Sequence, residues 1–230
     1  MERAARPLRV AVLASGRGSN LQAVLGAISA GRLGATVVGV FSDKARAPVL
    51  ERARAAGITT RALPPTGFAH RLAFDAAMFD AVEEAAPDLV VCAGYMRLIS
   101  EPQVTRMAGR LVNIHPSLLP AFKGLHTHRQ ALDAGVTRHG ASVHYVTPEL
   151  DGGPVIAQAR VPVLAGDDPQ TLSDRVLARE HPLLVETLRL FAAGRVALAD
   201  DHVVVDGSPI HVPLQLDPDN ALTPASLSDI

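Results

Sequence analysis

Tryptophan is absent from this sequence, and aromatic residues make up only 3% of it. We therefore expect a core built from Leu, Val, Ala and Ile. Cysteine occurs once, at Cys92, which excludes an internal disulfide framework and favours a reducing compartment. No apolar run reaches the roughly 18 residues of a membrane span, and the first residues lack the sustained apolar core of a secretory signal. We expect a cytoplasmic protein that does not enter a membrane.

An excess of charge of either sign is also missing. Basic residues number 22 and acidic residues 23, for a formal net charge of -1. This balance argues against nucleic acid or an anionic membrane as a partner, although it leaves room for a local phosphate pocket. With 48% apolar and 20% charged residues, the chain should fold. We predict one domain over residues 1–200 and a weakly patterned tail over residues 201–230.

Short apolar runs alternate with helical periods along the chain. Predicted strands cover residues 9–14, 36–41, 58–62, 88–93, 110–113, 141–146 and 155–161. Predicted helices cover residues 20–30, a segment ending at 54, and residues 68–86, 101–107, 127–134 and 170–193. This order indicates an α/β fold, with a mostly parallel sheet and helices on both faces. We also expect Pro182 to kink the last helix and one further strand near residues 203–205.

A glycine-rich turn, SGRGSN, follows the first predicted strand and opens a helix. Backbone N–H groups at such a turn can hold a phosphate, with Gly18, Ser19 and Asn20 as the candidate contacts. A plain tight turn with Asn20 as the helix N-cap explains the residues equally well. The turn is not a Walker loop, because GK[ST] is missing, and it departs from G-x-G-x-x-G at the last glycine.

Two polar side chains lie at the end of the strand near residue 111. Asn113 and His115 are two residues apart, so on an extended segment they point to the same side. The Asn amide can donate to a developing oxyanion, and the imidazole can exchange a proton near neutral pH. Asp151, far along the chain, is either a turn former or a carboxylate that folds back and favours the imidazolium form of His115. The trio suits an acyl-type transfer to a substrate amine.

Metal binding is the competing interpretation of the histidines at positions 115, 126, 128, 139 and 144. The H-x-H spacing of His126 and His128 is a weak signal, no Cys cluster accompanies it, and H-E-x-x-H is missing, so we predict no metal. Cys92 lies inside a predicted strand and should be an inert core thiol. The loop from Gly94 to Ser100 could line an apolar slot for a heterocycle, but ordinary packing is the simpler interpretation.

Five segments of the chain carry a family resemblance. They read ASGRGSNLQA, AGYMRLIS, LVNIHPSLLPAFKGLHTHRQAL, HGASVHYVTPELDGGPVIAQ and AREHPLL, between residue 8 and about residue 195. In this order they resemble the folate-dependent phosphoribosylglycinamide formyltransferase family, and NIHPSLLP followed by ELDGGP is its most specific signature. The resemblance implies a Rossmann-like formyltransferase fold. It also implies formyl transfer from 10-formyltetrahydrofolate to the amine of glycinamide ribonucleotide, in de novo purine (IMP) biosynthesis, by a monomer or homodimer without a metal.

The resemblance further implies roles for individual residues. Asn113 and His115 would steady the tetrahedral intermediate, with His115 as proton donor and Asp151 favouring its protonated form. Residues implied for ribonucleotide binding are Gly18, Ser19, Asn20, Leu177, Ala178, Arg179 and Glu180. Residues implied for folate binding are Arg71, Met96, Arg97, Leu98, Ile99, Asn113, Thr147, Pro148, Glu149, Leu150 and Asp151.

Three residues depart from the family pattern, namely Arg17, Lys123 and Pro182. Three alternatives differ in what they require. Methionyl-tRNA formyltransferase needs a basic C-terminal domain, which this near-neutral chain lacks. Formyltetrahydrofolate hydrolase carries an N-terminal regulatory domain, whereas here the first strand starts near Arg9. A non-catalytic nucleotide-binding protein would make the trio of Asn113, His115 and Asp151 incidental.

Overall fold

The computed structural model describes residues 6–225, which form a nine-stranded sheet and a smaller three-stranded one. The strands of the large sheet are β1 (Leu8–Leu13), β2 (Ala35–Ser42), β3 (Thr60–Ala62), β4 (Leu89–Cys92), β5 (Leu111–His115), β6 (Arg138–Tyr145), β7 (Val155–Pro162), β11 (Leu214–Leu216) and β12 (Leu222–Thr223). Their order is β12-β11-β7-β6-β5-β4-β1-β2-β3. Strands β3, β2, β1, β4 and β5 are parallel, and β6 is antiparallel to both neighbours. The prediction of a mostly parallel sheet is confirmed.

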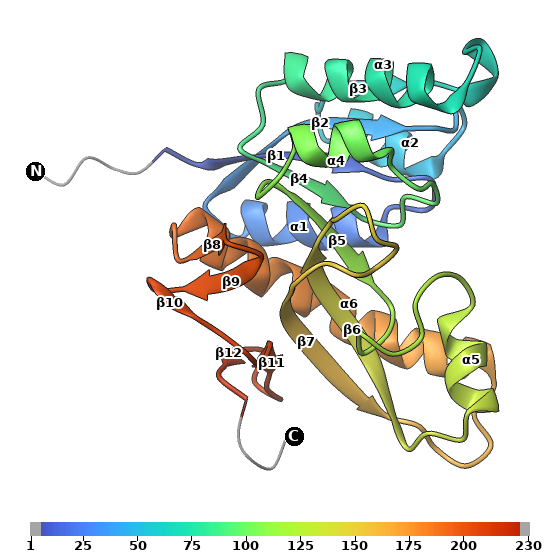
Figure 1. Ribbon diagram of the computed structural model, residues 1–230, viewed down its shortest axis with the longest axis vertical. Helices are drawn as coiled ribbons and strands as arrows, with labels where there is room; N and C mark the ends of the chain where they lie inside the picture. Colours follow the sequence, from blue (N-terminus) through green and yellow to red (C-terminus); the bar gives the residue numbers. More distant parts are fainter. Residues whose placement is uncertain (1–5, 226–230) are drawn as a thin grey trace, which may run out of the picture.

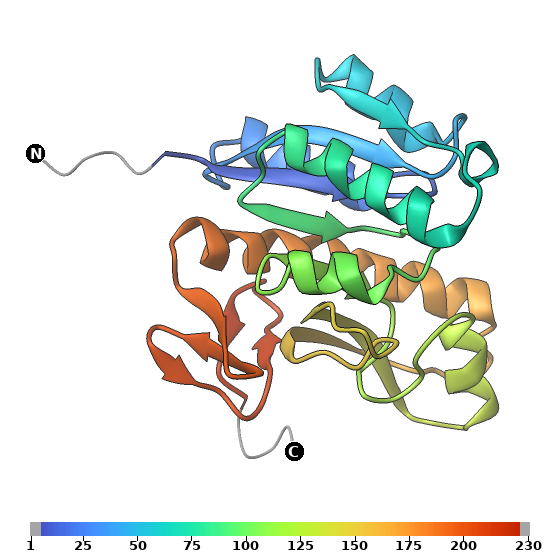
Figure 2. The same ribbon diagram turned by 45° about the horizontal axis from the view of Figure 1, so that its top comes forward.

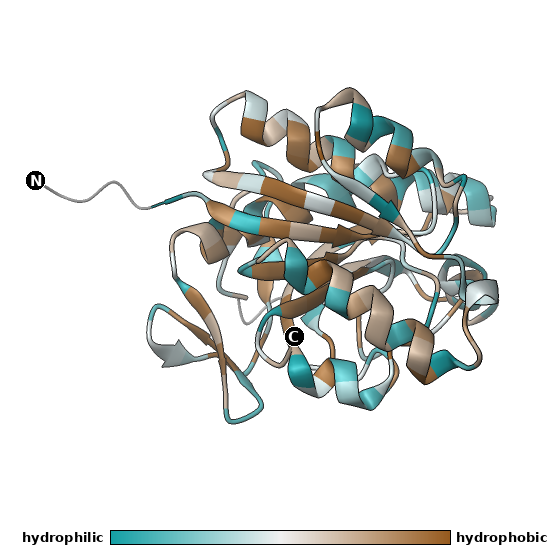
Figure 3. Ribbon diagram, turned by 90° about the horizontal axis from the view of Figure 1, so that it is seen from above, coloured by the Kyte–Doolittle hydropathy of each residue, from teal (hydrophilic) through white to brown (hydrophobic). Residues whose placement is uncertain are grey.

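Helices cover both faces of this sheet, as predicted (Figure 1; Figure 2). They are α1 (Ser19–Ser29), α2 (Pro48–Ala55), α3 (Arg71–Glu84), α4 (Glu101–Arg106), α5 (Thr127–Asp133) and α6 (Pro169–Ala192), with a short 3-10 turn η1 (Pro65–Gly67). In β1, Val10 and Val12 pack on the side of α1, α2 and α6, whereas Ala11 and Leu13 pack on the side of α3. Burial on both faces explains why the parallel strands are continuous apolar runs in the sequence. Figure 3 shows this apolar character along the central strands.

Each predicted helix and strand lies within a few residues of its observed position. One local interpretation needs correction. The residue that precedes α1 is Gly18, in a left-handed conformation with φ 77°, and no side chain caps the helix, so Asn20 is not an N-cap. Helix α6 begins with a capping box between Asp168 and Thr171 and includes Pro182, where a kink stays a prediction. Of the helices in residues 6–225, none is long and apolar enough to cross a bilayer.

The C-terminal region holds more strands than we expected. The small sheet is formed by β8 (Val196–Ala199), β9 (His202–Val205) and β10 (Ser208–Pro209), and β9 confirms the strand predicted there. Strand β11 pairs in parallel with β7 and extends the main sheet. The boundary placed at residue 200 falls in the turn between β8 and β9. Strands of two to four residues between turn-forming residues are too short to show a period, which is why the other strands of this region could not be predicted.

Candidate active site

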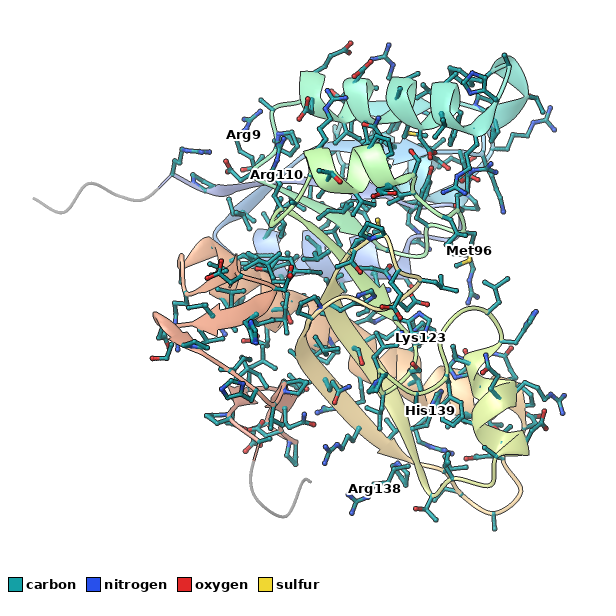
Figure 4. The ribbon with its side chains drawn as sticks, in the orientation of Figure 1. Arg9, Met96, Arg110, Lys123, Arg138 and His139 are labelled. Atoms are coloured by element: carbon teal, nitrogen blue, oxygen red, sulfur yellow. The ribbon has the colours of Figure 1, made fainter. Side chains whose placement is uncertain are left out.

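A cavity of about 1090 Å³ opens at the carboxyl ends of β1, β4 and β5. From β1 the chain proceeds to β2 and β3 on one side, whereas β4 and β5 lie on the other side of β1. The loops after β1 and β4 therefore lead away in opposite directions and leave a crevice between them. Ligands of α/β sheets commonly bind at such a switch in strand order. Met96, in the loop after β4, and Lys123, in the loop after β5, lie on the same side of the molecule (Figure 4).

The structure brings Asn113, His115 and Asp151 together in this cavity. His115 is 5% exposed at the end of β5, and its Nδ1 lies 3.6 Å from Asp151 Oδ2. The other ring nitrogen, Nε2, lies 3.1 Å from the carbonyl oxygen of Phe122. Asp151 has φ 45°, and the backbone N–H of Gly124 donates to its Oδ2 at 2.9 Å. A carboxylate fixed in this way can hold an imidazolium in one orientation.

His144 completes the polar end of the cavity, although the sequence suggested it only as a weak metal candidate. It pairs with Asn113 across β5 and β6, and its Nε2 lies 3.1 Å from the Asn113 amide nitrogen. Its Nδ1 lies 2.9 Å from the carbonyl oxygen of Tyr145. Burial lowers the pKa of His144 to about 4. A neutral ring with its proton on Nδ1 donates to that carbonyl and leaves Nε2 to accept from Asn113.

Five of the predicted ribonucleotide-binding residues line the cavity, namely Gly18, Ser19, Asn20, Leu177 and Glu180. A Cβ atom at Gly18 would lie 2.6 Å from Val49 Cγ2, so the turn needs glycine for space as well as for its φ. The Asn20 amide donates to Glu180 Oε2 at 3.0 Å, which ties α1 to α6. Burial raises the pKa of Glu180, and the hydrogen bond from Asn20 opposes that shift.

Most of the predicted folate-binding residues lie on two loops of the same cavity. Residues 96–99 follow β4, and residues 147–151 lie between β6 and β7. Met96 and Leu98 are 61% and 56% exposed, so their apolar side chains are open to the cavity. The guanidinium of Arg97 lies over the ring of Phe74, 5.0 Å from its centroid. The loop therefore lines the cavity, and its role in binding folate stays a prediction.

Three predicted binding residues do not line the cavity. Arg71 is half exposed in the first turn of α3, with its Nε 3.6 Å from Asp75. Ala178 and Arg179 lie between Leu177 and Glu180 on α6, and the helical period turns them to another side. Arg179 instead donates to Asn220 and to the carbonyl groups of Leu216, at the end of β11, and of Asp217, which follows it. Neighbours in sequence are therefore not neighbours in the site.

Cys92, His126 and His128 also line the cavity, but the structure gives them no metal-binding arrangement among the described residues. Among residues 6–225 there is no group of three or more His, Cys, Asp or Glu side chains that could hold a metal ion. His128 Nδ1 lies 3.2 Å from Nε2 of the buried His139, and His126 is the residue that precedes α5. Cys92 is buried in β4, and burial raises the pKa of its thiol to about 12. It is an inert core thiol, as predicted.

Comparison with known proteins gives a consistent set of relatives. The formyl transferase family model matches residues 8–188. A phosphoribosylglycinamide formyltransferase of Escherichia coli is 50% identical over 200 residues, which cover 87% of this chain and 94% of that protein. The trifunctional purine biosynthetic protein adenosine-3 of Bos taurus is 46% identical over 193 residues, which cover 84% of this chain and 19% of that protein.

Solved structures show the same fold. A phosphoribosylglycinamide formyltransferase from Coxiella burnetii superposes with a TM-score of 0.86 at 46% identity, covering 89% of this chain and 96% of that one. A formyltetrahydrofolate deformylase from Burkholderia mallei superposes with a TM-score of 0.79 at 31% identity, covering 87% of this chain and 70% of that one. The Coxiella burnetii structure is more similar to this chain than the Burkholderia mallei structure, both in TM-score and in sequence identity.

Proposed function

This chain belongs to the formyl transferase family, and we propose that it transfers the formyl group of 10-formyltetrahydrofolate to the amine of glycinamide ribonucleotide, a step of de novo purine (IMP) biosynthesis. The observation that carries the proposal is the pairing of His115 with Asp151 at 3.6 Å, next to Asn113, in a cavity of about 1090 Å³. A volume of that size suits drug-sized ligands, for which cavities of roughly 300–1000 Å³ are usual.

The reaction needs an oxyanion site and one proton donor. The substrate amine attacks the formyl carbon, a C–N bond forms, and the carbonyl oxygen becomes an oxyanion that the Asn113 amide and the His115 imidazolium stabilise. When the bond from the formyl carbon to N10 breaks, N10 takes a proton from His115, and the proton that the former amine releases returns to His115. Asp151 holds the imidazolium in place between these steps. The protein itself supplies no nucleophile.

The two substrates would approach from different parts of the cavity. We place the ribonucleotide phosphate at the N–H groups of residues 18–20, where the start of α1 favours an anion. Glu180, held by Asn20, then faces the glycinamide end. We place the folate between the loops at residues 96–99 and 147–151. The formyl carbon and the amine would meet beside Asn113 and His115.

Three further expectations belong to this proposal. We propose that transfer proceeds without a bound metal, because Asn113 and His115 can supply the stabilisation that a Lewis acid would otherwise give. We propose that the protein works in the cytoplasm as a monomer or homodimer. Residues 1–200, on this proposal, carry the transfer reaction, and the strands after residue 200 support them.

One comparison tests the reaction. Purified protein should convert 10-formyltetrahydrofolate to tetrahydrofolate when glycinamide ribonucleotide is present, and not when it is omitted, because the attacking group comes from the substrate. Absorbance follows the folate, and mass spectrometry follows the formylated ribonucleotide. Glycinamide without the ribose phosphate is the matched control and should react poorly. Equal turnover without any amine would contradict the proposal and indicate a deformylase like the Burkholderia mallei relative.

A further inference from the structure

Two buried carboxylates, Asp43 and Asp75, have no part in the proposed chemistry. They are 6% and 2% exposed, and neither lines the cavity. Asp43 follows β2, and Asp75 lies on α3. A buried carboxylate needs hydrogen-bond donors to offset the loss of hydration. The donor to Asp43 is a side chain that follows β1, and the donor to Asp75 is a backbone N–H of the segment that follows β4.

Asp43 reaches the start of that loop through a serine. The Ser15 hydroxyl donates to Asp43 Oδ1 at 2.6 Å, and the backbone N–H of Met96 donates to the same hydroxyl oxygen at 3.0 Å. Ser15 is 4% exposed, so water does not compete for these bonds. Ser15 also opens the loop that leads to Gly18. This bridge therefore joins the loops that we assign to phosphate and to folate.

Asp75 holds the other end of the loop. Its Oδ2 accepts the backbone N–H of Ser100 at 2.9 Å, and the same oxygen lies 3.6 Å from Arg71 Nε. Ser100 is 4% exposed and is the residue that precedes α4. Between the two anchored ends, Met96 and Leu98 present exposed side chains to the cavity. The backbone of this exposed loop is thus held near both ends by buried carboxylates, Asp43 through Ser15 at Met96 and Asp75 at Ser100.

We propose that Asp43, through Ser15, and Asp75 are positioning residues that hold the loop at residues 94–100 in the conformation that binds the folate. The inference rests on the proposed function for the identity of the ligand. A loop that is already ordered loses little conformational freedom on binding, and this raises affinity without a new contact. Asp75 touches only the folate side, whereas Ser15 joins both loops. The two anchors should therefore affect the two substrates differently.

Asp75→Ala tests the first anchor. The KM for 10-formyltetrahydrofolate should rise about tenfold, as expected for loss of a hydrogen bond to a charged group, with kcat and the KM for glycinamide ribonucleotide changed by less than about twofold. Asp75→Asn keeps an acceptor oxygen and should hold the folate KM within about threefold of the wild type. Asp80→Ala is the matched control on the same helix, because Asp80 is 62% exposed and, within residues 6–225, pairs only with Arg106.

Ser15→Ala tests the second anchor and does not depend on whether Asp75→Ala folds. It should raise both KM values, and Asp43→Asn, which keeps the acceptor, should raise them less. Calorimetric titration with tetrahydrofolate measures folate affinity without turnover, so it decides this inference even if the ribonucleotide is not the substrate. A folate-selective loss in Asp75→Ala supports the inference. Equal losses for both substrates in Asp75→Ala, or an unchanged folate affinity in both Asp75→Ala and Ser15→Ala, would overturn it.

Discussion

Two histidines of β6 are kept neutral by their surroundings. His139 has no exposed surface and His144 is 2% exposed, and burial lowers the pKa of each to about 4. Desolvation penalises the charged form of a buried imidazole, and for His139 the neighbouring His128 adds to the effect. The neutral form of His144 matters for the site, since only a neutral ring can accept a hydrogen bond from the Asn113 amide. The same burial makes the fold sensitive to acid.

The sign of that sensitivity follows from proton binding. Between pH 7 and pH 5 the unfolded chain gains protons at these histidines, with an ordinary pKa near 6.5, while the folded chain does not. Stability should therefore fall as the pH drops, by about 2 kcal/mol at pH 5 for each such histidine. Urea unfolding at both pH values measures this, and His139→Gln should lose less stability between them than the wild type. An identical loss in His139→Gln would contradict the assignment, and His202→Gln, at an exposed site, is the control.

At the scale of single elements, helix α6 shows which binding residues can be predicted from the sequence and which cannot. The family resemblance implies residues 177–180 as one binding segment, yet Leu177 and Glu180 line the cavity while Arg179 contacts Leu216 of β11 and the turn that follows it. A match of consecutive residues cannot show which side of a helix faces a ligand. The strand-end residues Asn113 and His115 were predictable because alternation and strand order fix their direction. The position of His144 was not predictable, since it lies opposite Asn113 only because of the register between β5 and β6, which is set when the chain folds.

Arg179 gives a prediction for this element. Its guanidinium donates to Asn220 Oδ1 at 2.7 Å and to the carbonyl oxygens of Asp217 at 2.6 Å and Leu216 at 3.2 Å. Arg179→Ala should lower the free energy of unfolding by about 1 to 3 kcal/mol, because these bonds join α6 to β11 and to the turn between β11 and β12. Urea denaturation measures the loss. Arg189→Ala, on the same helix, is the control, since Arg189 is 54% exposed and pairs only with Glu186. Equal effects in the two variants would show that the Arg179 contacts do not stabilise the fold.

For the molecule as a whole, the alternation of strands and helices was enough to predict the architecture and the edge at which the site lies. Apart from β9, the C-terminal strands could not be predicted, because their apolar residues are few and separated by turns. Yet Val203, Leu214 and Leu216 belong to the same buried cluster as Val10 of β1. The region after residue 200 therefore shares its core with the first strand of the sheet.

A shared core predicts one cooperative unfolding transition that mutations after residue 200 shift as a whole. Leu216→Ala, at a side chain 7% exposed on β11, should destabilise the protein by about 2 to 5 kcal/mol, because a cavity opens beside β7. Urea unfolding followed by far-UV circular dichroism should show a single transition moved to lower urea. Leu164→Ala is the control, since Leu164 is 53% exposed and should change stability by less than about 0.5 kcal/mol. An unchanged main transition in Leu216→Ala, or a separate early one, would mean instead that the strands after residue 200 fold apart from the rest.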